Sequence, residues 1–200
     1  AIGFLGNASA LQLSAGHITP RVDPDGVVRA MPAFICYEGD AYPALALASF
    51  LEATGLVDEP LRLESGSWFE SMITMYVGDV LQVPLTLDGH LVVPFDGQAS
   101  QFSRVSASDV LAGSTLPMGR WVVIGSSAVG LSDRVVTPLA PLEAGALIHM
   151  RLLRGLLDER LPSQVPIASA SLWLVALLIS TLLGTAASMG ALRWWAAPLA

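Results

Sequence analysis

Two carboxylates stand one residue apart in the stretch Asp23-Pro24-Asp25-Gly26, and carboxylate oxygens are ligands that Ca²⁺ prefers. A calcium loop of the EF-hand type needs another oxygen ligand two residues later and a distal glutamate. Val27 stands at the first of these positions, so the stretch does not satisfy that pattern. Aspartates around a proline and before a glycine are typical of an Asx-type turn, which is the structure that we expect here.

A second candidate for chemistry is the Gly- and Ser-rich stretch of residues 125–130, which follows an apolar run. It matches neither the G-x-S-x-G pattern of a nucleophile elbow nor the G-x-G-x-x-G pattern of a dinucleotide site. Ser126 or Ser127, together with His149 and Asp133, would supply the residue types of a membrane-tethered hydrolase. Because no elbow motif supports that function, we assign no catalytic residue and expect no enzyme activity in this chain.

Composition excludes several cofactors and partners. The net charge is −7, whereas proteins that bind nucleic acid cluster Lys and Arg against the phosphates. All ten basic residues are Arg, and the absence of Lys removes the Walker A loop and the pyridoxal Schiff base. Cys36 is the single cysteine and is expected to be a buried thiol, and the three His show no metal-ligand spacing. We therefore expect no cofactor, no metal site and no nucleic acid partner.

Hydrophobic periodicity and turn residues predict strands mixed with helices. Pro32 interrupts the first strand, because proline cannot donate a hydrogen bond to a neighbouring strand. Asp88-Gly89 is a pair favoured in two-residue hairpin turns, and Gly55 is expected to end a helix. The expected strands are residues 27–37, 72–76, 83–87 and 91–93, and the expected helices are residues 42–54, 106–113 and 144–161.

The run Trp121-Val122-Val123-Ile124-Gly125 is short, continuous and apolar, as expected of a buried parallel strand. Residues 144–161 have the spacing of an amphipathic helix that packs on a sheet. Its apolar side comprises Leu147, Met150, Leu153, Leu157 and Leu161, and its polar side comprises Arg151, Arg154 and Asp158. The expected fold class is α/β, a mixed sheet with a buried parallel strand and flanking helices, in a sensor-like domain of residues 1–162 that one transmembrane helix follows.

No charged residue lies between Arg160 and Arg193. Residues 166–189 fit a transmembrane helix, which needs about 20 apolar residues, and Arg193 with the two tryptophans after it is typical of an interfacial anchor. By the positive-inside rule, residues 190–200 would be a cytoplasmic juxtamembrane segment or the start of a second span, with the domain outside. A stripe of small residues predicts a face that packs on another membrane helix; it comprises Ala176, Ser180, Gly184 and Ser188.

Several stretches, in order along the chain, carry a resemblance to a known family: residues 22–29, 42–48, 105–113 and 122–128, Asp133 with residues 137–139, and residues 145–149. They resemble the type-2 CHASE domain, a sensory extracellular domain associated with cyclases and histidine kinases in bacterial membrane receptors. The resemblance covers roughly residues 1–160, and the apolar C-terminal helix falls where that family has its membrane spans. The family's N-terminal half, with its leading membrane helix, is not in this sequence, so we expect the chain to be a piece of a longer protein.

The resemblance implies a domain that senses a condition or an unknown small ligand and relays it through membrane helices to a cytoplasmic output domain. In that family the outputs include histidine kinases of two-component systems, nucleotide cyclases, diguanylate cyclases and Ser/Thr kinases. The implied location is the lipid bilayer of the bacterial inner membrane, with the globular part in the periplasm and a homodimer or other membrane subunits as partners. The alternative is a non-sensing structural or accessory subunit of a membrane complex. The candidate ligand-binding residues are Asp23, Asp25, Arg29, Ser126, Ser127, Asp133, Thr137 and His149.

Overall fold

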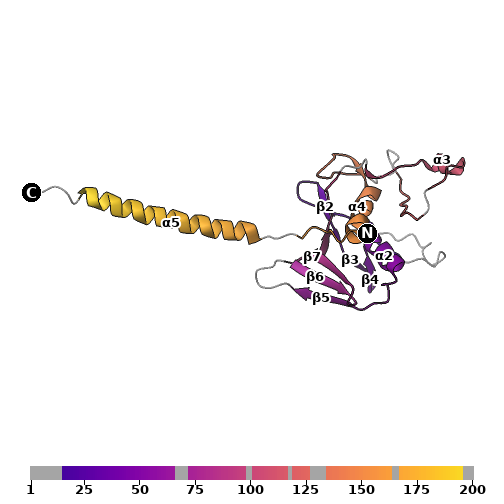
Figure 1. The fold of residues 1–200 in the computed structure, drawn as a ribbon, viewed down its shortest axis with the longest axis horizontal. Coiled ribbons are helices and arrows are strands. Elements are labelled where there is room, and N and C mark those ends of the chain that lie inside the picture. Colours follow the sequence, from indigo (N-terminus) through magenta and orange to yellow (C-terminus); the bar gives the residue numbers. More distant parts are fainter. Residues whose placement is uncertain are drawn as a thin grey trace, which may run out of the picture.

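The computed structural model describes residues 15–65, 72–97, 101–116, 119–126, 134–163 and 167–195. Within these residues, short strands and helices form a body from which one long helix projects (Figure 1). The strands are β1 (Arg21–Val22), β2 (Val28–Pro32), β3 (Phe34–Tyr37), β4 (Asp40–Pro43), β5 (Leu61–Ser65), β6 (Met72–Val77), β7 (Leu81–Thr86), β8 (His90–Val92), β9 (Arg134–Val135) and β10 (Glu143–Ala144). The helices are α2 (Leu45–Thr54), α3 (Ala107–Leu111), α4 (Gly145–Leu157) and α5 (Ile167–Trp195).

The described strands form four small sheets, and every pairing between named strands is antiparallel. Two sheets have three strands, in the orders β1-β2-β8 and β5-β6-β7, and the other two pair β3 with β4 and β9 with β10. In the described part of the chain, parallel pairing occurs as isolated bridges, His17 with Ala44 and Val27 with Val136. The expected α/β class is therefore confirmed, but as helices combined with antiparallel sheets.

The first expected strand is broken where the sequence predicts. β2 ends at Pro32, and β3 then pairs with β4 through a two-residue turn at Glu38 and Gly39. These residues have φ of 52° and 95°, the left-handed geometry that two-residue hairpins need. The expectation that the Cys36 thiol is buried is wrong, because Cys36 lies in the two-stranded β3–β4 sheet and is exposed there.

The helix expected over residues 42–54 begins later than its periodicity suggests. Tyr42 and Pro43 belong to β4, where they pair with the start of β3, so α2 starts at Leu45. The end is as expected, because Gly55 takes the left-handed conformation with φ of 71° and caps the helix. Strand pairing therefore decides the first residue of this helix, and a glycine decides the last.

The Asp88-Gly89 turn forms, but it does not close a hairpin ladder. Gly89 has φ of 75°, and its N–H donates to the carbonyl of Thr86 at 2.9 Å. The strand after the turn, β8, pairs with β2 instead of β7, so that Leu91 stands opposite Met31. The turn therefore carries the chain from the sheet of β5, β6 and β7 to the sheet of β1, β2 and β8.

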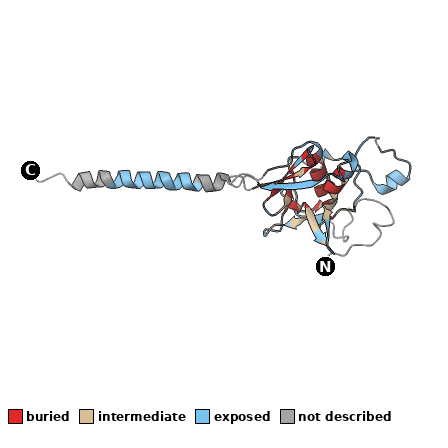
Figure 2. Ribbon diagram, turned by 90° about the horizontal axis from the view of Figure 1, so that it is seen from below, coloured by how far each residue is buried: buried red, intermediate tan, exposed pale blue. Residues whose placement is uncertain are grey.

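The core lies where α2 packs against α4 over these sheets (Figure 2). Leu47 of α2, Met75 of β6, Leu91 of β8 and Leu152 of α4 have no exposed surface. Complete burial of side chains of this size stabilises a fold by about 1.5–3 kcal/mol each relative to leaving them exposed. The two helices and both three-stranded sheets are therefore tied to one hydrophobic core.

The buried parallel strand expected over residues 121–125 is absent, and that prediction is wrong. Residues 119–126 have no regular secondary structure, and Ile124 is 94% exposed. The central strands β2 and β6 already have a neighbour on each side, so an apolar segment finds no central position in either sheet. The segment instead approaches α4 through Gly125, where a side-chain Cβ would lie 2.5 Å from the Cβ of Ala146.

The helix expected over residues 144–161 is α4, which ends at Leu157. Glu159 takes φ of 52°, and the N–H of Arg160 donates to the carbonyl of Gly155 at 2.8 Å, which closes the helix end. The expected polar side is wrong at Arg151, which is buried. Because Leu147, Ile148, Leu152 and Leu156 are buried as well, α4 is enclosed over more of its circumference than a surface helix would be.

β5 forms an edge of the sheet of β5, β6 and β7. All five of its residues are exposed, and Leu63 is 65% exposed although its partner in β6, Met75, is buried. Beyond β5, the described residues provide no further strand to this sheet.

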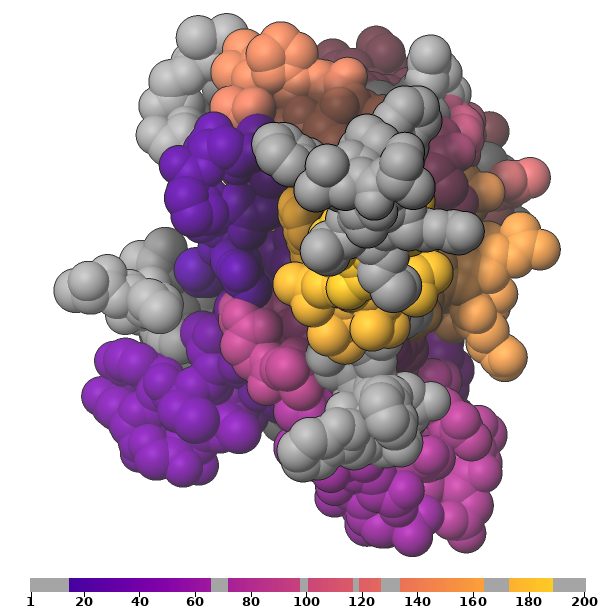
Figure 3. Space-filling view, turned by 90° about the vertical axis from the view of Figure 1, so that its left-hand side faces the viewer, coloured from indigo at the N-terminus to yellow at the C-terminus, as the bar shows by residue number. Residues whose placement is uncertain are grey.

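α5 is a single helix that runs from Ile167 to Trp195 and projects from the body (Figure 1), and Figure 3 views the molecule from the end of this helix. The large apolar side chains described along it, from Trp173 to Leu183, are exposed. Among the described residues, no helix combines the length and the apolarity that crossing a membrane requires. The domain boundaries expected at residues 162, 166 and 189 stay predictions.

The stripe of small residues lies on α5, and all four of its members are exposed. The hydroxyl of Ser180 donates to the carbonyl of Leu177 at 2.8 Å, and the hydroxyl of Ser188 donates to the carbonyl of Thr185 at 2.8 Å. Nothing lies within 4 Å of where a Cβ on Gly184 would stand. The use of Ala176, Ser180, Gly184 and Ser188 as a packing face stays a prediction.

Candidate functional site

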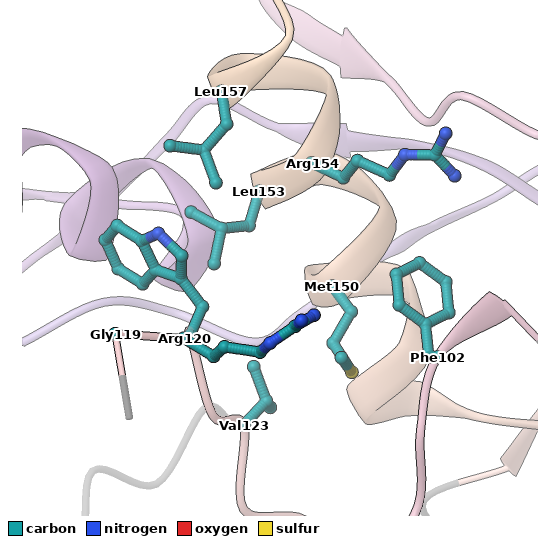
Figure 4. Close-up of a pocket in the computed structure, with 9 residues that line it drawn as sticks. Phe102, Gly119, Arg120, Val123, Met150, Leu153, Arg154 and Leu157 are labelled. Carbon is teal, nitrogen blue, oxygen red and sulfur yellow. The ribbon is translucent and has the colours of Figure 1, made fainter. Parts of the chain in front are cut away.

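A cleft of about 550 Å³ opens between α4 and the segment of residues 119–123 (Figure 4). Its apolar floor comes from three α4 residues, Met150, Leu153 and Leu157, which helical spacing places on one face. Figure 4 shows these side chains directed from α4 toward the segment that carries Arg120 and Val123. The lining residues are Phe102, Gly119, Arg120, Trp121, Val123, Met150, Leu153, Arg154 and Leu157.

Among the described residues that line the cleft, the charged side chains are two arginines and none is a carboxylate. Arg154 lies 3.4 Å from Asp158 (Nε to Oδ2) and also hydrogen-bonds the side-chain oxygen of Gln101. Arg120 is exposed and forms no ion pair with any residue that the structure describes. The described lining of the cleft therefore combines positive charge with apolar side chains, on a protein whose net charge is −7.

One aromatic wall of the cleft is held by a buried ion pair. The guanidinium of Arg151 lies 3.0 Å from the Glu143 carboxylate (Nη2 to Oε1) and donates from Nη1 to the carbonyl of Gly97 at 2.6 Å. It also lies 5.4 Å from the ring centre of Phe95 and 5.9 Å from that of Phe102. Because Phe102 lines the cleft, Arg151 and Glu143 hold its wall in place from behind.

The structure brings together three of the residues expected to bind a ligand, Asp23, Asp25 and Arg29. Nη1 of Arg29 lies 2.8 Å from Oδ2 of Asp23, and Nη2 lies 2.7 Å from Oδ2 of Asp25. The N–H of Val27 donates to Oδ1 of Asp25 at 3.1 Å, which confirms the expected Asx-type turn. The hydrogen bonds from Arg29 lower the pKa of Asp25 to about 2.

This group is part of a longer charge network on the sheet of β1, β2 and β8. Arg21 lies 3.5 Å from Asp23 (Nε to Oδ1) and 2.5 Å from Asp88 (Nη1 to Oδ2). Asp88 accepts a hydrogen bond from the Thr86 hydroxyl at 2.7 Å, which lowers the pKa of Asp88. Since the arginines already occupy these carboxylates, the network ties β1, β2 and the β7–β8 turn together. Among the described residues, no group of His, Cys, Asp or Glu side chains is arranged to hold a metal ion.

Two other expected site residues, Thr137 and His149, are buried. The Thr137 hydroxyl donates to the carbonyl of Ala140 at 3.3 Å and accepts from the N–H of Ala140 at 3.1 Å. These hydrogen bonds give Thr137 a structural role within one turn. Burial and, to a smaller extent, the proximity of His17 together lower the pKa of His149 to about 4. The His17 ring is itself buried, with Nε2 2.9 Å from the carbonyl oxygen of Pro32, and burial lowers its pKa as well.

The remaining candidates do not complete a site. Ser126 lies at the end of the exposed segment that approaches α4, and Ser127 and Asp133 lie outside the described residues. A hydrolase arrangement of a serine with His149 and Asp133 therefore stays untested.

Sequence reasoning missed the cleft and the buried ion pair. Arg120 and Arg154 are far apart along the chain, and each alone resembles an ordinary surface arginine. The sequence does indicate the cleft floor, because Met150, Leu153 and Leu157 belong to the predicted apolar side of residues 144–161. The helical spacing does not indicate which other segment of the chain faces that side.

The comparisons with known proteins agree with the resemblance. A family model of the CHASE2 domain matches residues 7–187. No curated protein and no solved structure matches the chain. The family model spans nearly the whole sequence, from before β1 into α5, and so includes the residues of the cleft. The chain therefore belongs to the CHASE2 domain family.

Proposed function

We propose that this chain is the sensory part of a bacterial membrane receptor, which detects a small ligand outside the cytoplasm and relays its binding to a cytoplasmic output domain. The observation that carries this proposal is the family, because CHASE2 domains are extracellular sensory domains. The proposal includes attachment of the protein to the bacterial inner membrane through α5. What supports the attachment is the uncharged sequence between Arg160 and Arg193 and the exposed apolar side chains along α5.

The position of the cleft on α4 supports its role as the sensing site. α4 contributes the cleft floor, and α5 is the next helix along the chain. The end of α4 is held by the Arg160 N–H, which bonds the Gly155 carbonyl at 2.8 Å, and by the contact of the Leu161 side chain with Gly155. A ligand that binds one arrangement of α4 more tightly shifts the population toward it, and the short connection passes that shift to α5.

A receptor chimera tests the sensory role. The full chain is fused after Ala200 to the cytoplasmic part of a histidine kinase, and kinase output is read from a reporter gene in bacterial cells. Met150→Trp, which places a larger side chain in the cleft, is expected to change the basal output about fivefold or more. The matched control is Leu63→Trp, on exposed β5, which is expected to leave output unchanged.

Equal output from the parent chimera and a folded Met150→Trp chimera would contradict the sensory role. That result would favour the alternative, a structural or accessory subunit that senses nothing. A thermal unfolding transition at the parent temperature shows whether the Met150→Trp body has remained folded.

Membrane attachment has its own test, extraction of cell membranes with alkaline carbonate. The full chain is expected to stay in the membrane pellet, and Leu178→Arg combined with Leu182→Arg is expected to release it, because a charged side chain in the bilayer centre costs about 2.5–3.5 kcal/mol. Leu63→Arg, an equally polar change at an exposed leucine of the body, should remain in the pellet. Release of the unmodified chain by carbonate would overturn the attachment.

A further inference from the structure

We infer that the cleft between α4 and residues 119–123 binds an organic anion, a carboxylate or phosphate carried on an aromatic or branched apolar body. This inference rests on the proposed function only in taking the same cleft as the sensing site. It adds the chemical class of the ligand, which follows from the size, the apolar lining and the charge of the cleft.

The size and lining fit a small organic molecule better than a bare ion. Sites for such molecules are clefts of about 300–1,000 Å³ with mainly apolar walls and a few polar groups, and this cleft measures about 550 Å³. Met150, Leu153 and Leu157 form an apolar floor, and Phe102 and Trp121 add two aromatic side chains. A bare ion would leave this apolar surface in contact with water, whereas an aromatic or branched body would cover it.

The charge of the cleft selects an anion. Arg120 and Arg154 are the charged residues in the described lining, and guanidinium groups match carboxylate and phosphate oxygens in paired hydrogen bonds. Figure 4 shows the Arg120 side chain reaching toward Met150, while the Arg154 side chain extends from α4 on the side of Phe102, away from Leu153 and Leu157. A ligand between Met150 and Phe102 would therefore meet positive charge from the segment of residues 119–123 and from α4.

Neither arginine forms a short ion pair with a residue that the structure describes. The Arg154 contact with Asp158 is long, at 3.4 Å, and both side chains are exposed, so this pair contributes little to stability. Arg120 has no ion-pair partner among the described residues. By contrast, the guanidiniums of Arg29 and Arg151 already bind carboxylates at 3.0 Å or less. The Arg120 guanidinium is therefore available to a ligand, whereas at Arg154 a ligand would compete with Asp158 and with the hydrogen bond to Gln101.

The aromatic wall favours a flat ligand. The Phe102 ring rests against Arg151, whose guanidinium is fixed by Glu143 and by the Gly97 carbonyl. A ring that is held in this way keeps its orientation, so a planar ligand can stack on it without the entropy cost of ordering the wall.

Calorimetry on the full chain in lipid nanodiscs tests the inference with three probes of similar shape. The probes are 3-phenylpropionate, phenyl phosphate and the neutral 3-phenylpropan-1-ol. At least one of the two anions is expected to bind at least about tenfold more tightly than the alcohol, because a charge-assisted hydrogen bond is worth that difference. Which anion binds more tightly distinguishes a carboxylate from a phosphate ligand.

Three variants locate the binding. Arg120→Gln and Arg154→Gln are each expected to weaken anion binding about tenfold, and Arg62→Gln, at an exposed arginine of β5 that does not line the cleft, is expected to leave it unchanged. Binding of the anion should also change the fluorescence of the parent protein, and that change should disappear in Trp121→Phe while the heat of binding remains.

The outcomes separate this inference from the proposed function. Equal affinity for the alcohol and the anions, no binding of any probe, or equal loss in all three arginine variants would each overturn the anion class. If Met150→Trp changes the chimera output while the anions do not bind, this inference fails and the sensory role stands. If the anions bind at Arg120 and Arg154 while the chimera output never changes, the sensory role fails and the inference stands.

Discussion

Arg151 and Glu143 form an ion pair at 3.0 Å (Nη2 to Oε1), with side chains that are only 3% and 4% exposed. Removing one partner from such a pair leaves an uncompensated buried charge, at a cost of about 3–5 kcal/mol. We therefore expect Arg151→Leu and Glu143→Leu each to lower the free energy of unfolding by about that amount. Chemical denaturation of the purified chain, followed by circular dichroism, measures the change.

The double variant, Arg151→Leu with Glu143→Leu, is expected to be more stable than either single variant, because it leaves no unpaired charge. Arg62→Leu serves as the control, since the pair of Arg62 with Asp79 is exposed and its loss should cost less than about 1 kcal/mol. A double variant as unstable as the sum of the single variants would show that the pair stabilises the fold by itself.

His149 makes stability depend on pH. Its side chain is buried, and burial together with nearby His17 lowers its pKa to about 4, below the ordinary value of 6.5. The unfolded state therefore binds the proton more readily, so stability is complete above about pH 6.5 and falls as the pH decreases toward 4. The loss amounts to about 3 kcal/mol, and the lowered pKa of His17 acts in the same direction.

Thermal unfolding measured between pH 4 and pH 8 checks this prediction. His149→Leu should remove a large part of the pH dependence in that range. A parental melting temperature that stays constant from pH 7 to pH 4.5 would show that the His149 proton is not linked to folding.

The ion pair of Asp25 with Arg29 makes stability depend on pH in a more acidic range. Because the pKa of Asp25 is lowered to about 2, the contribution of this pair is present above about pH 4 and is lost as the pH falls toward 2. We expect a carbon-detected NMR titration to give a pKa of about 2 for the Asp25 carboxyl group. In Arg29→Gln the pKa should return to its ordinary range, whereas Arg62→Gln should not affect it.

Gly155 of α4 lies against Leu161, in the chain that leads to α5. A Cβ at this position would lie 2.8 Å from the Leu161 side chain and 3.0 Å from the Pro94 ring. Gly155→Val should therefore lower the free energy of unfolding by about 1–3 kcal/mol through overpacking. Gly184→Val is the matched control on a helix, because nothing lies within 4 Å of its Cβ position. Equal stability of the two variants would mean that Leu161 moves aside at no cost.

Features determined by a few neighbouring residues could be predicted from the sequence. The turn at Asp23 to Gly26, the turn at Asp88-Gly89, the end of α2 at Gly55 and most of α4 follow from local hydrogen bonds, glycine conformations and periodicity. The CHASE2 family was also identifiable from short stretches in a fixed order. For the turns and the helices, the information lies within about ten residues of the feature.

Features that depend on distant partners could not be predicted. The apolar run of residues 121–125 has the composition of a buried strand, but a strand also needs an unoccupied sheet position, which depends on the rest of the fold. Arg151 was assigned to a polar surface because helical spacing says nothing about Glu143, Gly97 and Phe95. The cleft depends on the same kind of information, since Arg120 and Arg154 come together only in the folded chain.

The exposed strand β5 has a consequence for how the purified protein behaves in concentrated solution. Backbone N–H and C=O groups along the edge of a sheet can pair with a strand from another molecule. The side chains of that strand would lie beside Leu61 and Leu63, which are exposed on β5. At neutral pH the net charge of −7 keeps molecules apart, and acid removes this repulsion as carboxylates become protonated. Colloidal stability is therefore lowest in mildly acidic buffer, and storage at neutral pH and low salt best preserves a monodisperse sample.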